Sequence, residues 1–165
     1  MEQLNPIPKR VLIVDDERCV REIIKLNLEL NGFAVDEAAF AQQALDLFVA
    51  NDYDLMTLDF RMPGLDGSKL HYVLSKGFGH GRRVSEIIPQ RIPPVLVITG
   101  CADDPTVEEL LQRENVVGIL EKPITHDALI GAIKTIFTRI DSRKASHARL
   151  IAQLGSRIKS RRRIE

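Results

Sequence analysis

Short apolar segments alternate with segments of helical periodicity five times along this chain of 165 residues. The first of them, Arg10–Val14, is a continuous β-branched run, as in a strand that is buried on both faces of a sheet. The predicted strands cover residues 10–14, 33–38, 55–58, 95–98 and 116–120, and the predicted helices cover residues 19–30, 41–50, 68–75, 103–115 and 124–137. Such alternation predicts βαβ units, and therefore an α/β fold with a parallel sheet and helices on both faces. The second strand is less apolar than the others, which favours a place near a sheet edge.

The composition is that of an ordinary globular protein, with 44% hydrophobic and 28% charged residues. A domain of about 120 to 150 residues buries roughly two thirds of its unfolded surface, so it needs neither a disulfide nor a structural metal. The two cysteines, Cys19 and Cys101, have no metal-ligand spacing, and we expect reduced thiols. Because the chain has no apolar signal core and no apolar run of about 18 residues, we expect a cytoplasmic protein without a membrane span.

The formal net charge of zero hides an uneven distribution of charge. Residues 1–138 contain 14 Lys and Arg against 21 Asp and Glu, a net charge of −7. Residues 139–165 contain nine Lys and Arg against two acids, a net charge of +7. We therefore expect an irregular lead-in at residues 1–9, one domain at residues 10–140, and a basic, partly helical tail at residues 141–165. Such a charge asymmetry indicates two different kinds of partner.

The tail has three interpretations. Its apolar residues Leu150, Ile151, Leu154 and Ile158 fall on one helical face, and a cluster of positive charge follows them. The pattern fits a continuation of the preceding helix into solvent, or an amphipathic helix that docks on a partner or on a second copy. It also fits a segment that contacts nucleic acid or an anionic membrane, for which a steep fall of affinity with salt would be the sign.

Polar residues follow four of the predicted strands. Asp15 and Asp16 follow the first strand, Asp59 the third, Thr99 the fourth and Lys122 the fifth. Because the carboxyl ends of parallel strands line a common crevice, we expect these side chains to lie together. Two carboxylates 4 Å apart repel each other by about 4 kcal/mol at an effective dielectric constant near 20, which a hard cation relieves. The sequence therefore predicts a site for a divalent cation and a phosphoryl group.

The chain resembles the receiver domain of response regulators, the phosphoacceptor module of bacterial two-component signalling, over roughly Lys9–Ile140. The motifs that carry the resemblance stand in order at the ends of predicted strands: the pair Asp15 and Asp16, the segment Asp59–Gly67, Thr99 with Gly100, and Lys122 with Pro123. The resemblance implies a flavodoxin-like, doubly wound parallel sheet of five strands in the order 2-1-3-4-5.

The resemblance also implies a role for each residue of the site. Asp59 would be the phosphorylation site and nucleophile, taking its phosphoryl group from a histidine kinase or a histidine phosphotransfer protein. Asp16, Asp59 and the backbone carbonyl of Arg61 would ligate Mg²⁺, or Mn²⁺ in its place, and Asp15 would act mainly through a metal-bound water. Lys122 would neutralise charge on the transferring phosphoryl group.

Four neighbouring residues complete the implied site. The Thr99 hydroxyl would donate a hydrogen bond to the phosphoryl group after transfer. Pro123 would form a cis peptide bond with the lysine before it, and Gly64 and Gly100 would lie beside the site.

Two features depart from the family pattern. Receivers commonly carry an aromatic ring three residues before the lysine, where this chain has Ile119, so a readout through such a ring is not expected. The stretch from Asp59 to Thr99 is also longer than usual, which predicts an insertion at about residues 77–94. Its glycine-rich start follows a helix rather than a strand, which favours a helix end and a flexible insertion over a phosphate-binding loop. The four histidines have no ligand spacing and are expected to be solvent-exposed: His71, His80, His126 and His147.

We therefore expect a stand-alone receiver that relays a signal to a protein partner. It would not be an enzyme beyond self-catalysed phosphotransfer and autodephosphorylation. An aspartyl-phosphate hydrolase of the haloacid dehalogenase type would need a second acid two residues after the nucleophile, where this chain has Arg61. The alternative that stays open is a receiver whose basic tail contacts nucleic acid or another copy of itself, as in a dimer. The sequence identifies neither the kinase nor the downstream target.

Overall fold

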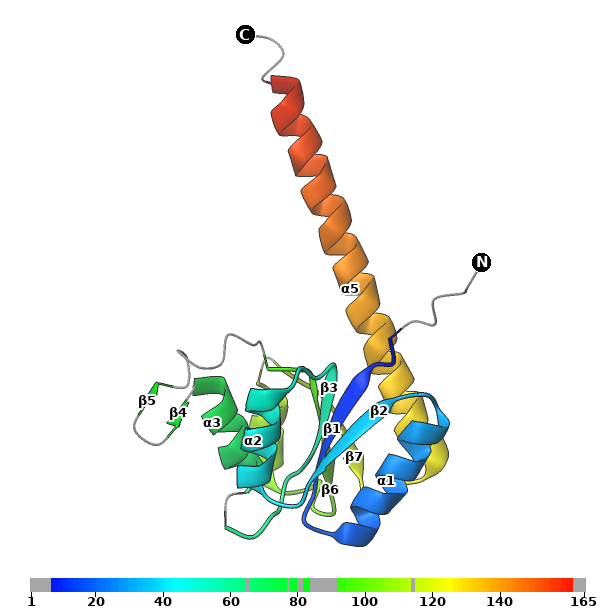
Figure 1. Ribbon diagram of the computed structural model, residues 1–165, viewed down its shortest axis with the longest axis vertical. Helices are drawn as coiled ribbons and strands as arrows, with labels where there is room; N and C mark the ends of the chain where they lie inside the picture. Colours follow the sequence, from blue (N-terminus) through cyan, green and yellow to red (C-terminus); the bar gives the residue numbers. More distant parts are fainter. Residues whose placement is uncertain are drawn as a thin grey trace. The chain divides into compact units, whose positions relative to one another are not determined.

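The main sheet has five parallel strands in the order β2-β1-β3-β6-β7 (Figure 1). The strands are β1 (Arg10–Val14), β2 (Ala34–Ala38), β3 (Leu55–Asp59), β6 (Val95–Thr99) and β7 (Val116–Glu121). This is the doubly wound order that the resemblance implied, since β6 and β7 are the fourth and fifth strands of this sheet. The less apolar β2 lies at an edge, as predicted. The computed structural model describes residues 7–64, 66–76, 78–79, 82–83, 92–113 and 115–161.

Helices follow the strands in the predicted order. They are α1 (Arg18–Leu30), α2 (Ala41–Ala50), α3 (Gly67–Lys76), α4 (Pro105–Leu111) and α5 (His126–Arg161). The predicted fourth helix began two residues before α4 and ended four residues after it, and α5 continues well beyond its predicted end at Phe137. The chain divides into two compact units, Met1–Ile130 and Gly131–Glu165. No helix among the described residues is long and apolar enough to cross a membrane.

A second, two-stranded sheet lies within the predicted insertion. Strands β4 (Phe78–Gly79) and β5 (Arg82–Arg83) pair in antiparallel fashion, with Phe78 opposite Arg83. The prediction of a flexible insertion did not include this pair of short strands. The rest of residues 77–91, including His80, lies outside the described residues, as do residues 1–6 of the predicted lead-in.

The sheet is covered on both faces, which explains why its central strands read as continuous apolar runs. Every residue of β3 and β6 is buried, and so are four of the five residues of β1. Figure 1 shows α2 and α3 on one side of the sheet and α1 on the other. The first side holds a single apolar cluster to which four strands contribute: Leu12 and Val14 from β1, Ala38 from β2, Met56 and Leu58 from β3, and Val95 and Val97 from β6.

The loop after β3 is closed by a backbone contact that only glycine permits. The Gly67 N–H donates to the carbonyl oxygen of Phe60 at 3.0 Å, which brings the start of α3 against the end of β3. A Cβ at Gly67 would lie 2.2 Å from the carbonyl oxygen of Asp59 and 3.1 Å from the Cα of Phe60. Within the same loop, Gly64 has a φ of +82°, a conformation that glycine adopts most readily. The glycines of this loop therefore set the position of the backbone around Asp59.

Buried His71 contradicts the expectation that all four histidines are exposed. The ring, on α3, is 2% exposed, and its Nδ1 lies 3.2 Å from the guanidinium of Arg113. Arg113 also donates to the carbonyl and hydroxyl oxygens of Ser68, so it ties α3 to the segment after α4. His126 and His147 are exposed, as predicted. Burial and the nearby charge of Arg113 lower the pKa of His71 to about 4.

We predict that Gly67→Ala destabilises the protein by about 2 kcal/mol or more, because the backbone atoms that its methyl group would meet cannot move cheaply. Chemical denaturation measures the free energy of unfolding. Gly131→Ala is the control: nothing lies within 4 Å of its added Cβ and the residue is within α5, so we expect a stabilisation of about 0.5–1 kcal/mol. Equal effects of the two substitutions would contradict this role of Gly67.

We also predict that His71 makes stability depend on pH. The folded-state pKa lies below the unfolded value, so the stabilising contribution is complete above about pH 6.5 and is lost as the pH falls toward 4. The loss should approach about 1.4 kcal/mol per pH unit across this window. Denaturation of wild type and His71→Phe at a series of pH values tests this, with His147→Gln as the exposed control. The slope should weaken only in His71→Phe, and an unchanged slope would contradict the prediction.

Candidate functional site

The candidate site lies at the carboxyl ends of β1, β3, β6 and β7, which are consecutive in the sheet. Asp59 is the last residue of β3 and Thr99 the last of β6, whereas Asp15 and Lys122 directly follow β1 and β7. The Asp15 N–H donates to the carbonyl oxygen of Ala38, which extends the ladder by one residue. The Lys122 N–H donates to the carbonyl oxygen of Thr99 at 2.8 Å. Parallel pairing therefore brings these four predicted residues to one edge.

The Lys122 ammonium is the centre of the site. It lies 3.0 Å from Asp15 Oδ2, 2.8 Å from Glu17 Oε1 and 3.1 Å from Asp59 Oδ2. Asp15 and Asp59 are 1% and 4% exposed, whereas the Glu17 side chain is 54% exposed. Two buried carboxylates and one exposed carboxylate thus share a single cation.

Burial dominates the electrostatics of this group. Loss of hydration raises the pKa of Asp15, and it raises the pKa of Asp59 together with the negative charge of Asp15. Burial also disfavours the charged form of Lys122, but contacts with Glu17 and Asp15 outweigh this and hold its pKa above the usual value. The ammonium therefore stays charged while the two buried acids repel each other. Additional positive charge would stabilise their ionised forms.

The oxygen atoms of this site fit a hard divalent cation. Carboxylate oxygens of Asp15, Glu17 and Asp59 lie within 4.8 Å of one another. Asp15 Oδ2 is buried and, despite its ion pair with Lys122, has no hydrogen-bond partner among the described residues. A buried anionic oxygen with spare acceptor capacity, beside two further carboxylates, matches the ligand chemistry of Mg²⁺.

Sequence reasoning did not include Glu17 in the site. An acidic segment directly after a strand is typical of a helix cap, and Glu17 does occupy the N-cap position of α1. Its side chain makes no capping hydrogen bond and contacts Lys122 instead. The signal available in the sequence was a third acid directly after Asp15 and Asp16. Asp16 is exposed and lies outside the cluster of three acids.

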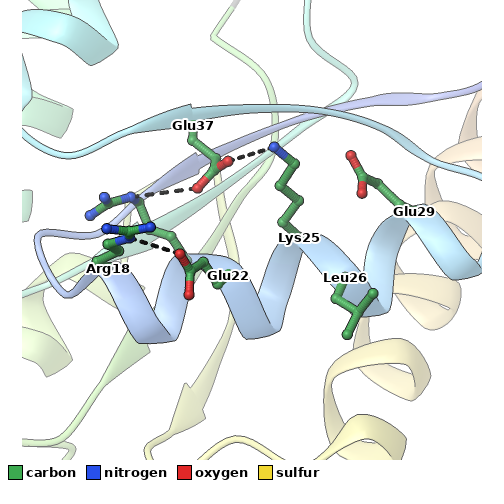
Figure 2. Close-up of a pocket in the computed structure, with 7 residues that line it drawn as sticks. Arg18, Glu22, Lys25, Leu26, Glu29 and Glu37 are labelled. Atoms are coloured by element: carbon green, nitrogen blue, oxygen red, sulfur yellow. Dashed lines mark hydrogen bonds and ion pairs between the residues drawn. The ribbon is translucent and has the colours of Figure 1, made fainter.

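The backbone of Asp15 and Asp16 is held from α1. One guanidinium nitrogen of Arg21 donates to both carbonyl oxygens, at 2.8 and 3.1 Å. Arg21 also pairs with Glu37 on β2 at 3.6 Å, and Lys25 on α1 pairs with the same carboxylate at 2.7 Å. Figure 2 shows Glu37 beside Lys25 in the pocket at α1 and β2. These ion pairs tie α1 to the sheet and fix the start of the acidic segment.

Arg61 links the loop after Asp59 to α4. Its N–H donates to Asp59 Oδ1 at 3.2 Å, and its guanidinium forms an ion pair with Asp104. Asp104 is the N-cap of α4 and accepts from the Thr106 N–H at 2.9 Å. Asp16, Arg61 and Asp104 line a cleft of about 550 Å³. Asp59 Oδ1 thus accepts a hydrogen bond from a residue that also pairs with the N-cap of α4.

The remaining residues that the sequence analysis singled out differ in their burial and their contacts. Thr99 is fully buried, and its hydroxyl accepts a hydrogen bond from the Cys101 N–H at 3.1 Å. The Lys122–Pro123 peptide bond is cis, as predicted. Gly100 is exposed, with open space around it. Ile119 is partly buried and packs against the core, and both cysteines are free and exposed.

Comparison with known proteins places this geometry in a family. The model of the response regulator receiver domain matches residues 11–134. The response regulator MprA of Mycolicibacterium vanbaalenii is 44% identical over 61 residues, which are 37% of this chain and 26% of that protein. The transcriptional regulatory protein PdtaR of Mycobacterium tuberculosis is 29% identical over 160 residues, 96% of this chain and 71% of that protein. The chain spans about a quarter of the length of the first curated relatives it matches.

Solved structures agree with this assignment. The receiver domain of Francisella response regulator 1452 has a TM-score of 0.64 and 27% sequence identity, over 80% of this chain and 98% of that chain. A receiver domain protein from Methanospirillum hungatei has a TM-score of 0.67 and 22% identity, over 83% of this chain and 99% of that one, and it shows the fold alone. The family model covers most of the chain, and the chain therefore belongs to the response regulator receiver family, a signalling domain of two-component systems rather than a classical enzyme.

Proposed function

We propose that this receiver accepts a phosphoryl group on Asp59 and relays the resulting signal to a protein partner. The observation that carries the proposal is the contact of the buried Asp59 carboxylate with Lys122, beside Asp15, at the carboxyl edge of the sheet. Response regulators receive phosphate from histidine kinases. We propose a histidine kinase or a histidine phosphotransfer protein as the donor here.

The transfer exchanges one bond of phosphorus for another. A carboxylate oxygen of Asp59 forms a bond to phosphorus while the phosphorus–nitrogen bond of the donor phosphohistidine breaks. The electron pair of the broken bond stays on the imidazole nitrogen, which takes up a proton. Lys122 stabilises the negative charge of the transferring group from a fixed position, so little reorganisation is needed. The Thr99 hydroxyl would then exchange its contact with the Cys101 N–H for a hydrogen bond to the phosphoryl group.

We further propose that the acidic cluster binds Mg²⁺, with Mn²⁺ as a substitute. Asp15 and Asp59 would hold the ion from the buried side. The family pattern adds Asp16 and the backbone carbonyl of Arg61. When bound, the ion supplies Lewis-acid stabilisation of the phosphoryl oxygens. Pro123, Gly64 and Gly100 would shape the loops around the site.

We assign residues 10–140 to the receiver, with the insertion at about residues 77–94, and residues 141–165 to a separate basic segment. Within that segment α5 continues to Arg161, and residues 141–149 are all exposed. An exposed helix with a net positive charge supports the alternative in which this segment contacts nucleic acid or a second copy of the chain.

The first test of this function is phosphorylation of Asp59. Wild type should be modified by acetyl phosphate with Mg²⁺, and Asp59→Asn should abolish the modification because an amide is not a nucleophile here. Mass spectrometry of the intact protein measures the added mass, and cleavage of the label by hydroxylamine identifies an acyl phosphate. Asp46→Asn, a change at an exposed acid on α2, is the control. Equal labelling of wild type and Asp59→Asn would refute the assignment.

A second test concerns the metal. An ion that binds only the folded protein stabilises it by about 1.4 kcal/mol when its free concentration is ten times its dissociation constant. We therefore expect the melting temperature of wild type to rise with millimolar Mg²⁺, and Asp15→Asn to lose most of this rise. The exposed Asp46→Asn should respond as wild type does. Thermal melts that are insensitive to Mg²⁺, or a full response of Asp15→Asn, would contradict the proposed site.

A further inference from the structure

Three carboxylates surround the ammonium of Lys122 before any phosphoryl group is present. An ammonium has three N–H donors, and three carboxylate oxygens lie within 3.1 Å of it. The contacts with Glu17 and Asp59 have hydrogen-bond geometry, and the contact with Asp15 is an ion pair. A phosphoryl group that approaches Lys122 therefore competes with these carboxylates for its positive charge and its N–H donors.

The three contacts differ greatly in the cost of breaking them. Asp15 is buried, so its carboxylate would stay unpaired in a site with little water if it lost the cation, and phosphorylation itself converts the Asp59 carboxylate into an acyl phosphate beside Lys122. The Glu17 side chain is 54% exposed, so water can solvate its carboxylate as soon as the contact opens. Glu17 is therefore the partner that Lys122 gives up at the lowest cost.

The local backbone allows this exchange. Glu17 is the N-cap residue of α1, yet its side chain makes no capping hydrogen bond. Its N–H donates to Asp15 Oδ1 at 2.8 Å, and its carbonyl oxygen accepts from the Arg21 N–H at 3.1 Å. The backbone of Glu17 is thus fixed by contacts that do not involve its carboxylate. The side chain can release Lys122 without disturbing α1 or the acidic segment.

We propose that Glu17 is a positioning residue that holds the Lys122 ammonium in the unphosphorylated protein and gives it up to the phosphoryl group on Asp59. This inference rests on the proposed function of the site. Glu17 thus competes with the phosphoryl group for the same ammonium. The affinity of the protein for a phosphoryl mimic is therefore lower than it would be without the Glu17 contact.

The test measures, by calorimetry, the affinity of the full chain for beryllofluoride, a mimic of the acyl phosphate, at saturating Mg²⁺. Glu17→Gln should bind about two- to fivefold more tightly than wild type, the range that the loss of an exposed ion pair gives. Glu17→Asp keeps the charge but is one methylene shorter, so it should also bind more tightly. Glu22→Gln, which removes an exposed acid that pairs with Arg18, should match wild type.

The variants separate the contact from two other effects of Glu17. If Glu17→Asp binds beryllofluoride as wild type does while Glu17→Gln binds more tightly, general charge repulsion explains the result and the inference is overturned. If Glu17→Gln weakens Mg²⁺ binding without fluoride about tenfold or more, and beryllofluoride affinity does not rise, Glu17 is a metal ligand and the inference is again overturned. Unchanged Mg²⁺ affinity with tighter beryllofluoride binding supports it.

Failure of the inference is distinguishable from failure of the proposed function. Wild type that binds beryllofluoride, with Asp59→Asn that does not, supports Asp59 as the acceptor whatever the Glu17 variants do. In that case, equal affinities of wild type, Glu17→Gln and Glu17→Asp overturn only the role of Glu17. If wild type itself does not bind beryllofluoride, the proposed function fails and the role of Glu17 fails with it.

Discussion

The pairing of two buried carboxylates with one ammonium is the interaction on which the site depends. Asp15 and Asp59 come from neighbouring strands, and the sheet buries both almost completely. Burial of two anions is unfavourable unless a cation lies between them, and Lys122 supplies that cation from the loop after β7. The strand order is therefore a condition for this charge arrangement, because it brings the end of β1 and the loop after β7 to the two sides of β3 and β6.

Backbone contacts give this charge cluster its fixed geometry. Gly67 lets the start of α3 approach the Asp59 carbonyl more closely than any side chain would permit. On the opposite side, Arg21 holds the carbonyl oxygens of Asp15 and Asp16. The Lys122 N–H donates to the Thr99 carbonyl, which sets the base of the lysine relative to β6. The main chain thus positions the charged residues of this cluster.

The sequence predicted the sheet well because buried parallel strands leave a strong local signal. The apolar runs predicted β1 (Arg10–Val14) with its observed bounds, and they predicted both ends of the other four strands to within one residue. The resemblance supplied the strand order, which periodicity does not contain. Features that depend on tertiary contacts were not predictable in this way. The local pattern around Glu17 is that of a helix cap and does not indicate its contact with the distant Lys122. The pattern around His71 is that of a polar residue on an amphipathic helix and does not indicate its contact with Arg113.

The contacts around Asp59 also determine which parts of the fold respond to a change there. Ile119 packs against the core and offers no polar group to the site. Arg61, in contrast, connects Asp59 to α4: its N–H donates to the Asp59 carboxylate, and its guanidinium pairs with Asp104 at the start of α4. Asp104 in turn caps α4 through Thr106. A change of charge at Asp59 therefore acts on Arg61, which pairs with the carboxylate that caps α4. The end of a helix is sensitive to the loss or gain of such capping contacts.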